Sequence, residues 1–264
     1  MEPFYGTGLN HWTPDTMPLR RTTQLIGSEK QTLLAETRVL LIGVGGVGGY
    51  ALEMIARCGV KHITVIDADY ISVSNINRQL LADHTTVGTP KAELAAERIS
   101  RISPKTEVVA RVALVTPDSI DSLNLSSYDL VVDAIDAVPA KIALIEACCE
   151  AGVAIFSSMG AAGKLDPTQV RVAMLSQAHG CRLARKIRKT LRQHGVMQDI
   201  PVVFSPEQSS QVLSGNSTEE NEPSFDTRRP LGTISYLPAQ FGILLGYAVI
   251  RHLLDQAVAP ASAS

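Results

Sequence analysis

The sequence is poor in cysteine and shows none of the cysteine spacings that hold metals or build disulfide frameworks. Its 264 residues contain four cysteines, Cys58, Cys148, Cys149 and Cys181, and no CxxC pair. A structural zinc site is therefore not expected, nor is a disulfide-rich fold. Buried thiols are the simpler interpretation of these residues.

The chain also lacks a recognisable targeting segment and a clean membrane span. Residues 1–20 do not show the basic, apolar and small-residue regions of a signal peptide, so we expect them to form a loose arm of a cytoplasmic protein. The most apolar stretch, Leu237 to Leu254, is interrupted by Gln240 and Arg251 and is shorter than the ~20 apolar residues of a span. We expect a buried or dimer-interface helix here and no stable membrane insertion.

Charge of one sign is not in excess, since 24 basic residues face 26 acidic ones and the formal net charge is -2. With 45% hydrophobic and 19% charged residues, the composition is that of an ordinary globular enzyme. We expect residues 1–264 to form one domain. Residues 205–230 contain too few apolar side chains to pack, and we expect them to form a mobile loop within it.

Short apolar runs alternate with segments of helical periodicity. Strands are predicted near Val39, Ile63, Val108, Val131 and Ile155, and another over Val170 to Leu175. This alternation is typical of an α/β fold, a doubly wound, Rossmann-like and mainly parallel sheet, here followed by an irregular C-terminal extension. Thr89 and Pro90 predict a helix start, with Thr89 as N-cap and Pro90 as the first helical residue.

A glycine loop lies between the strand Arg38 to Ile42 and a helix that ends near Arg57. Its glycines are Gly43, Gly45, Gly46 and Gly48. Glycines in this position let the backbone turn and approach a nucleotide, while the helix start offers free N–H groups. Asp67 follows the next predicted strand. It lies ~20 residues after the glycine loop, which is the distance along the chain at which a carboxylate meets a ribose hydroxyl. A nicotinamide-binding oxidoreductase would fit this pattern equally well.

The residues after Asp67 favour a triphosphate. Asn75, Arg78, Gln79 and Lys91 follow in close succession and have no evident use in hydride transfer. Arginine offers a planar fork to phosphate oxygens and lysine a compact charge, and a carboxylate such as Asp136 can hold a bridging magnesium ion. The pattern therefore predicts ATP and Mg²⁺ as cofactors.

These motifs, GVGGVG, DAD, SNINRQ and VGTPKA in that order, resemble the adenylating superfamily related to ubiquitin-activating enzymes, over about Arg21 to Leu254. Three later segments resemble its branch of bacterial tRNA threonylcarbamoyladenosine dehydratases rather than the activators of sulfur carriers. They are Phe156 to Thr168, Leu183 to Arg192 and Val202 to Glu207.

The resemblance implies a role for each motif residue. It places Asp67 on the ATP ribose, and Asn75, Arg78 and Lys91 on the phosphates. It implies that Asp136 holds Mg²⁺, although Ala137 stands where the family has asparagine; Asp133 would then cap or brace the loop.

Arg21 falls where the family has an arginine that reaches across a homodimer into the partner's ATP site. The neighbouring Arg20 leaves the register of this match open.

The segment Arg182 to Arg192 is strongly basic. Its basic residues are Arg182, Arg185, Lys186, Arg188, Lys189 and Arg192. Such a cluster is the footprint expected for a nucleic-acid backbone, and with the resemblance we expect contact with tRNA. The alternative is a solvated amphipathic face with Ile187 and Leu191 inward. No aromatic stacking pattern accompanies the charges, so base-specific readout is not indicated.

The reaction implied by the resemblance is adenylation of the carboxylate of threonylcarbamoyladenosine, followed by cyclisation with loss of AMP. An activator of a small sulfur-carrier protein is the alternative, but the missing zinc pairs and the basic helix count against it. No cysteine follows Cys181, which disfavours thioester transfer. A persulfide-relay protein as a partner is left open.

Overall fold

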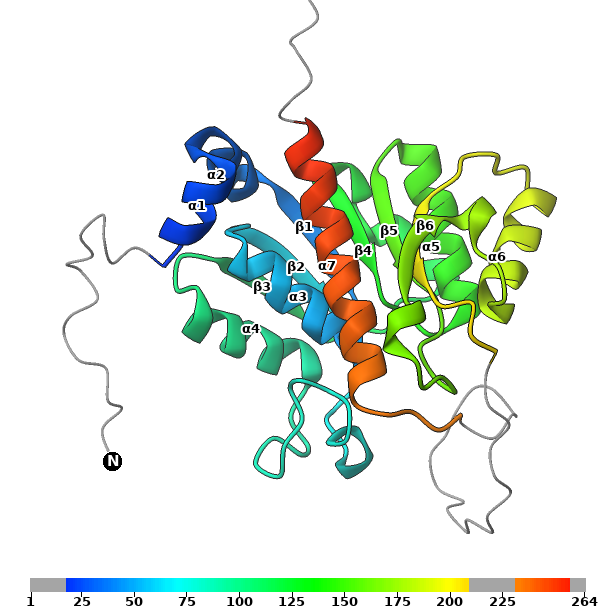
Figure 1. Ribbon diagram of the computed structural model, residues 1–264, viewed down its shortest axis with the longest axis horizontal. Helices are drawn as coiled ribbons and strands as arrows, with labels where there is room; N and C mark the ends of the chain where they lie inside the picture. The colour runs from blue at the N-terminus through cyan, green and yellow to red at the C-terminus, as the bar shows by residue number, and fades with distance from the viewer. Residues whose placement is uncertain (1–17, 209–230, 257–264) are drawn as a thin grey trace, which may run out of the picture.

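The computed structural model describes residues 18–208 and 231–256 (Figure 1). Residues 1–17 of the predicted arm and residues 209–230 of the predicted loop lie outside the described residues. The described part is built on one seven-stranded sheet with the order β3-β2-β1-β4-β5-β7-β6. The strands are β1 Arg38–Ile42, β2 His62–Ile66, β3 Glu107–Arg111, β4 Leu130–Asp133, β5 Ala154–Ser158, β6 Arg171–Met174 and β7 Pro201–Phe204.

All strand pairs are parallel except β6 with β7, which are antiparallel. The predicted α/β class, the mainly parallel sheet and the six predicted strands are confirmed. Strand β7 was not predicted, because its four residues follow a polar stretch and are too few to show the alternating pattern of a strand. It enters the sheet between β5 and β6 and so separates two strands that are consecutive in the sequence.

Helices cover both faces of the sheet (Figure 1). They are α1 Arg20–Ile26, α2 Ser28–Glu36, α3 Gly48–Arg57, α4 Lys91–Ile102, α5 Val138–Ala151, α6 Arg182–Gln193 and α7 Tyr236–Gln256. One core lies between the sheet and helices α2, α3, α4 and α7, and the other between the sheet and helices α5 and α6. Alternate side chains of β1 pack into the two cores, as expected for a strand in a sheet that is buried on both faces.

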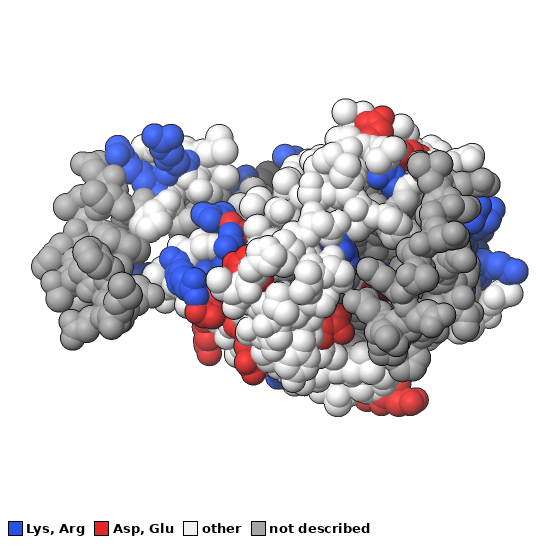
Figure 2. Space-filling model, turned by 90° about the horizontal axis from the view of Figure 1, so that it is seen from below, with Lys and Arg blue, Asp and Glu red and all other residues white. Residues whose placement is uncertain are grey.

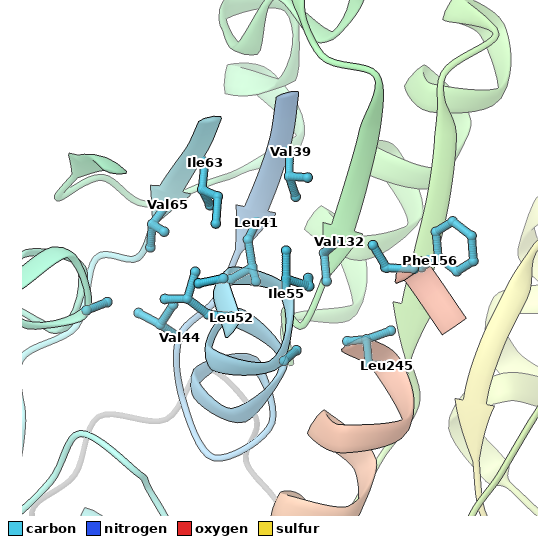
Figure 3. Close-up of a cluster of buried hydrophobic side chains, with 14 of the residues drawn as sticks. Val39, Leu41, Val44, Leu52, Ile55, Ile63, Val65, Val132, Phe156 and Leu245 are labelled. Carbon is cyan, nitrogen blue, oxygen red and sulfur yellow. The ribbon is translucent and has the colours of Figure 1, made fainter. Parts of the chain in front are cut away.

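The first core is drawn in Figure 3. Side chains from β1, β2 and β4, such as Leu41, Val65 and Val132, project toward Leu52 of α3 and Leu245 of α7. The two helices meet closely, because a Cβ at Gly242 of α7 would lie 2.4 Å from the carbonyl oxygen of Val47. Glycine is thus required where α7 crosses the start of α3.

Helix α7 is the one described helix long and apolar enough to cross a membrane. More than half of its most apolar window is buried inside the protein, however. Leu237, Phe241, Leu245 and Val249 are fully buried. The prediction of a buried helix is confirmed, and its apolar character is explained by packing on α3 and the sheet.

The predicted start of α4 was wrong by one residue. Pro90 is the N-cap, with extended ψ of 129°, and Lys91 is the first helical residue. The reason is a short backbone bridge: the amide of Ile71 donates to Thr89, and that of Lys91 donates to Asp69. These hydrogen bonds hold Pro90 extended and so delay the helix.

Candidate nucleotide site

The glycine loop lies at the carboxyl ends of β1 and β4, where the order of the sheet reverses. Sequence order runs outward from β1 to β2 on one side and from β4 to β5 on the other. Open α/β sheets bind ligands at this switch point, where loops diverge and leave a crevice. The predicted glycines are therefore placed where the fold provides room for a nucleotide.

Two glycines of the loop are required by close contacts. Gly43 has φ +89°, and a Cβ there would lie 2.7 Å from the carbonyl oxygen of Ala134. A Cβ at Gly48 would lie 1.7 Å from the carbonyl oxygen of Gly43. Glycine is the residue that tolerates both the positive φ and such close approach. The turn is thus fixed tightly against the loop after β4, and it leads into the N-terminus of α3.

Asp67 is locked beside this loop. Its carboxylate accepts hydrogen bonds from the amides of Val44, at 2.7 Å, and Asp69, at 2.8 Å. Burial raises the pKa of Asp67 and outweighs these hydrogen bonds and the charge of Lys91, which act to lower it. A carboxylate that is held this way can accept a hydrogen bond from a sugar hydroxyl without rearranging.

Asn75 and Arg78 belong to the turn that follows β2. Asn75 is buried, and its side-chain oxygen accepts from the amide of Ser72. Arg78 is half-buried and donates to the carbonyl of Ser74 at 2.6 Å, which orients the guanidinium. A Cβ at Gly46 would lie 3.6 Å from Arg78 Cγ, so the arginine stem lies directly against the glycine loop.

Gln79 adds an amide to the same place. It is 8% exposed, and its Oε1 has no hydrogen-bond partner among the described residues. Its Nε2 lies 3.7 Å from the Cβ position of Gly45. An unsatisfied buried amide costs stability unless a ligand or water completes it, so this side chain also indicates a polar ligand at the loop.

Lys91 is brought toward the site by the bridge that holds the start of α4. Its side chain is only 7% exposed, and its Nζ lies 2.7 Å from Asp69 Oδ2. Asp69 follows two residues after Asp67 and is largely exposed. The lysine is thereby positioned at the carboxyl end of β2 instead of extending into solvent.

Asp133 and Asp136 occupy different environments. Asp136 is exposed in the loop between β4 and α5, beside Ala134, which contacts Gly43. Asp133 is fully buried and pairs with Lys141, and it accepts from the amide of Ile135. Asp133 therefore braces the loop, and Asp136 is the carboxylate with room for a cation.

The described residues contain no group of three His, Cys, Asp or Glu side chains that could hold a metal by themselves. Magnesium on a nucleotide does not need one, since it binds one or two carboxylates together with phosphate oxygens and water. The exposed Asp136 carboxylate fits that arrangement.

Arg21 is not brought to the glycine loop of its own chain. It is exposed on α1, which packs on α2. Helix α2 in turn is tied to the far end of α3, where Gln31 Nε2 donates to the carbonyl of Cys58 at 3.0 Å. The ten-residue helix α3, about 15 Å long, separates this end from Gly48 (Figure 1).

The basic residues of α6 divide into two groups. Ala184, Ile187 and Leu191 face the core, and five basic residues are exposed on the other side: Arg182, Arg185, Lys186, Lys189 and Arg192. Arg188 is half-buried, and its Nη1 donates to the carbonyls of Leu175 and Ala178 at 2.8 Å. Basic side chains are visible at the end of the molecule where α6 lies, and others are visible at the opposite end (Figures 1 and 2).

The cysteines form no disulfide. Cys148 and Cys181 are buried, whereas Cys58 and Cys149 are half-buried, so the prediction of buried thiols holds for two of the four. Burial, with a contribution from the charge of Asp133, raises the pKa of Cys148 to about 12. This thiol stays protonated at neutral pH.

Sequence reasoning missed a segment that crosses the carboxyl edge of the sheet, residues 232–236. Asn77 Nδ2 donates to Thr233, Gly163 donates to Gly232, and the Tyr236 hydroxyl donates to Leu165. The segment thus links the turn that bears Arg78 to the loop after β5. The sequence did not predict it, because each of these hydrogen bonds joins segments that are far apart in the sequence.

A doubly wound α/β fold with a glycine turn, an acidic residue after β2 and basic side chains around the switch point defines a nucleotide-binding protein. Residues 19–263 match the model of the ThiF family, and the chain belongs to that family.

Similarity to the relatives extends over nearly the whole chain. A tRNA threonylcarbamoyladenosine dehydratase of Bacillus subtilis is 34% identical over 237 residues, which cover 89% of this chain and 93% of the relative. The Escherichia coli protein of the same name is 34% identical, covering 91% and 93%. A crystal structure of the E. coli dehydratase in complex with ATP superimposes with a TM-score of 0.80 at 32% identity, covering 90% and 93%.

Proposed function

We propose that this protein is an ATP-dependent tRNA threonylcarbamoyladenosine dehydratase, which converts that nucleoside in tRNA to its cyclic form. The observation that carries this proposal is that the likeness to the dehydratases covers about 90% of the chain. It therefore includes the half that follows the nucleotide-binding motifs, and in this proposal the contacts with the acceptor substrate lie in that half. In this proposal residues 1–264 form one adenylating domain, which works in the cytoplasm with its tRNA.

ATP binds at the glycine loop, where Gly43, Gly45, Gly46 and Gly48 let the backbone approach the nucleotide. Asp67 accepts from the ribose, which its fixed position beside Val44 supports. Asn75, Arg78 and Lys91 contact the phosphates, and a bound triphosphate gives Arg78 a stronger acceptor than the carbonyl it now contacts.

Asp136 would hold magnesium together with the phosphates of ATP. The ion would supply neutralisation of phosphate charge, which favours departure of pyrophosphate. The chain's own cations, Arg78 and Lys91, share this work, and Arg21 of a second copy in a homodimer adds to it. Catalysis of this step is chiefly positioning and charge stabilisation.

The first step is attack of the substrate carboxylate oxygen on the α-phosphorus of ATP. The bond to the β-phosphate breaks, and pyrophosphate leaves with the bond electrons. The carbamoyl oxygen then attacks the activated carbonyl carbon, AMP leaves with one former carboxylate oxygen, and a carbamoyl nitrogen gives up its proton. The product is a five-membered oxazolone that has lost the elements of one water.

The substrate is held through its phosphates by the exposed basic face of α6. Arg182, Arg185, Lys186, Lys189 and Arg192 project from that face. We assign Arg188 chiefly to bracing the turn before α6, because its Nη1 donates to carbonyls there.

Mass spectrometry of nucleosides tests the proposal. tRNA that carries threonylcarbamoyladenosine is incubated with the protein, magnesium and ATP, and is digested mildly so that the cyclic product is not hydrolysed. We expect ATP-dependent loss of one water from threonylcarbamoyladenosine. No loss despite ATP binding would overturn the proposal and favour a small sulfur-carrier protein as the acceptor.

A further inference from the structure

The most deeply buried charges of the described chain lie directly behind the loop that bears Asp136. Asp133, the last residue of β4, and Lys141, in the second turn of α5, both have fully buried side chains. Burying an ion pair carries a large desolvation cost for each ion, and apolar residues of similar volume often stabilise the fold equally well. A pair retained in such a place calls for a role beyond stability.

The hydrogen bonds of the pair tie three elements together. Lys141 Nζ donates to Asp133 Oδ2 at 2.7 Å, to the carbonyl of Ser158 at 3.0 Å and to Ser157 Oγ at 3.3 Å. Ser157 Oγ donates to Asp133 Oδ2 at 2.6 Å. The ends of β4 and β5 and the start of α5 are thereby joined at one point, and all three donors of the lysine are used.

The second oxygen of Asp133 acts on the loop itself. Asp133 Oδ1 accepts from the amide of Ile135 at 3.0 Å, and the amide of Ala134 donates to the carbonyl of Ile42 at 2.9 Å. The carbonyl oxygen of Ala134 lies against Gly43. The loop between β4 and α5 is thus fixed from behind by the ion pair and from the side by β1, with Asp136 exposed on its outer surface.

We infer that Lys141 and Asp133 are positioning residues that hold the loop 134–137 so that the Asp136 carboxylate faces the cation on ATP. This inference rests on the proposed function. Neither residue touches the nucleotide, and both act through Asp136. The fixed carboxylate meets the metal without the ordering cost that a mobile loop would add.

The main test uses the double variant Asp133→Asn with Lys141→Met, which removes both charges and leaves no buried charge unpaired. Lys164→Met is the matched control, since Lys164 is also a buried lysine bonded to carbonyls, those of Ser205 and Glu207, in a different loop. Hydrogen exchange of residues 134–137 is measured without nucleotide. ATP affinity is measured with magnesium and with a chelator.

In the double variant we expect exchange at residues 134–137 to accelerate at least about 10-fold. We also expect the magnesium concentration for half-maximal pyrophosphate release to rise at least about 10-fold. ATP affinity in the chelator should change less than about twofold, because Arg78, Asp67 and Lys91 are untouched. Lys164→Met should leave loop exchange and magnesium dependence at wild-type values.

Unchanged loop exchange, or unchanged magnesium dependence, would overturn the inference and leave the pair a purely structural feature. If the double variant does not fold, Ser157→Ala decides, since it removes one hydroxyl and keeps both charges. Faster loop exchange and a higher magnesium requirement in Ser157→Ala, by smaller factors than those expected for the double variant, support the inference. Wild-type values of both in Ser157→Ala overturn it. Failure of the proposed function is seen separately, as a wild-type protein that dehydrates no tRNA while its loop exchange still responds to the variants.

Discussion

The residues around the glycine loop are of two kinds: glycines that fix the backbone of the turn, and charged side chains that are accessible to a ligand. The closest contact is at Gly48, where a Cβ would lie 1.7 Å from the carbonyl oxygen of Gly43. Asp136, in contrast, is exposed, and Arg78 is half-buried with its guanidinium bonded within its own turn, so the core does not depend on either side chain. Substitutions at the two kinds of position should therefore fail in different ways.

Arg78→Ala and Asp136→Ala should lower tRNA dehydration by about 100-fold or more, because each removes a group that stabilises phosphate charge. Both variants should keep the free energy of unfolding within about 0.5 kcal/mol of wild type. Arg101→Ala and Asp118→Ala, exposed residues away from the glycine loop, are the controls. Wild-type rates in either site variant, measured by nucleoside mass spectrometry, would contradict the assignment.

Gly48→Ala should destabilise the protein by about 3 kcal/mol or more, since backbone atoms that cannot move aside occupy the place of the new methyl group. Gly232→Ala is the matched control, because nothing lies within 4 Å of its Cβ position. Thermal unfolding compares the two. Equal melting temperatures would show that the turn is looser than described.

At the scale of elements, α3 and α4 are joined by a nearly buried carboxylate. Glu53 of α3 accepts from Arg98 of α4 at 2.6 Å and from Arg57 at 2.8 Å. Burial acts to raise the pKa of Glu53, but the hydrogen bonds and charges of the two arginines together hold it below its usual value. The carboxylate is therefore more stable ionised in the folded state than in the unfolded chain.

Glu53→Gln should lower the free energy of unfolding at neutral pH by about 2 kcal/mol. A lowered folded pKa gives stabilisation that is present above the unfolded pKa and is lost as pH falls through the folded value. The difference in melting temperature between wild type and variant should hence shrink below about pH 4.5. A difference independent of pH would show that the ion pairs do not contribute.

We propose helix α6 as the element that contacts tRNA phosphates. Changing Arg185, Lys186 and Lys189 to alanine should weaken tRNA binding. It should also reduce the magnitude of the slope of log affinity against log salt concentration by about 2, because each of the three lost phosphate contacts contributes about 0.7–0.9 to that slope. Lys61, Arg101 and Arg251 changed to alanine are the control with the same loss of charge. Binding is measured by titration at several salt concentrations. An unchanged slope would indicate that the basic face of α6 is solvated and does not contact tRNA phosphates.

The sequence predicted the strands that lead into the site, because Val39, Ile63 and Val131 lie in apolar runs flanked by turn residues. It did not predict β7 or the cap at Pro90, since both depend on hydrogen bonds to segments distant in sequence. The Asp133–Lys141 pair was equally hidden, because a lysine in the second turn of a helix looks like an ordinary surface charge until β5 covers it.

In the molecule as a whole, Arg21 is the predicted nucleotide-site residue that the fold does not bring to the glycine loop of its own chain. This residue lies near the far end of α3 from the glycine loop, so its expected role requires a second copy of the chain. A homodimer would then carry two sites, each with Arg78 from one subunit and Arg21 from the other. Such sharing makes a definite prediction for mixtures of inactive variants.

Arg21→Ala and Arg78→Ala should each be inactive alone. After unfolding and refolding together in equal amounts, half of the dimers are mixed, and each mixed dimer has one intact site. The mixture should regain about a quarter of the wild-type dehydration rate. No recovery, with dimers shown to exchange, would place Arg21 outside the active site.

In the proposed reaction the protein activates a carboxylate on tRNA by adenylation, and one carboxylate oxygen leaves in AMP. Substrate tRNA whose threonyl carboxylate carries oxygen-18 tests this most directly, with mass spectrometry of the AMP released. We expect one oxygen-18 atom in AMP for each nucleoside that loses water, because the carboxylate oxygen stays on the α-phosphorus when the ring closes. Unlabelled AMP, or dehydration without AMP, would contradict the account.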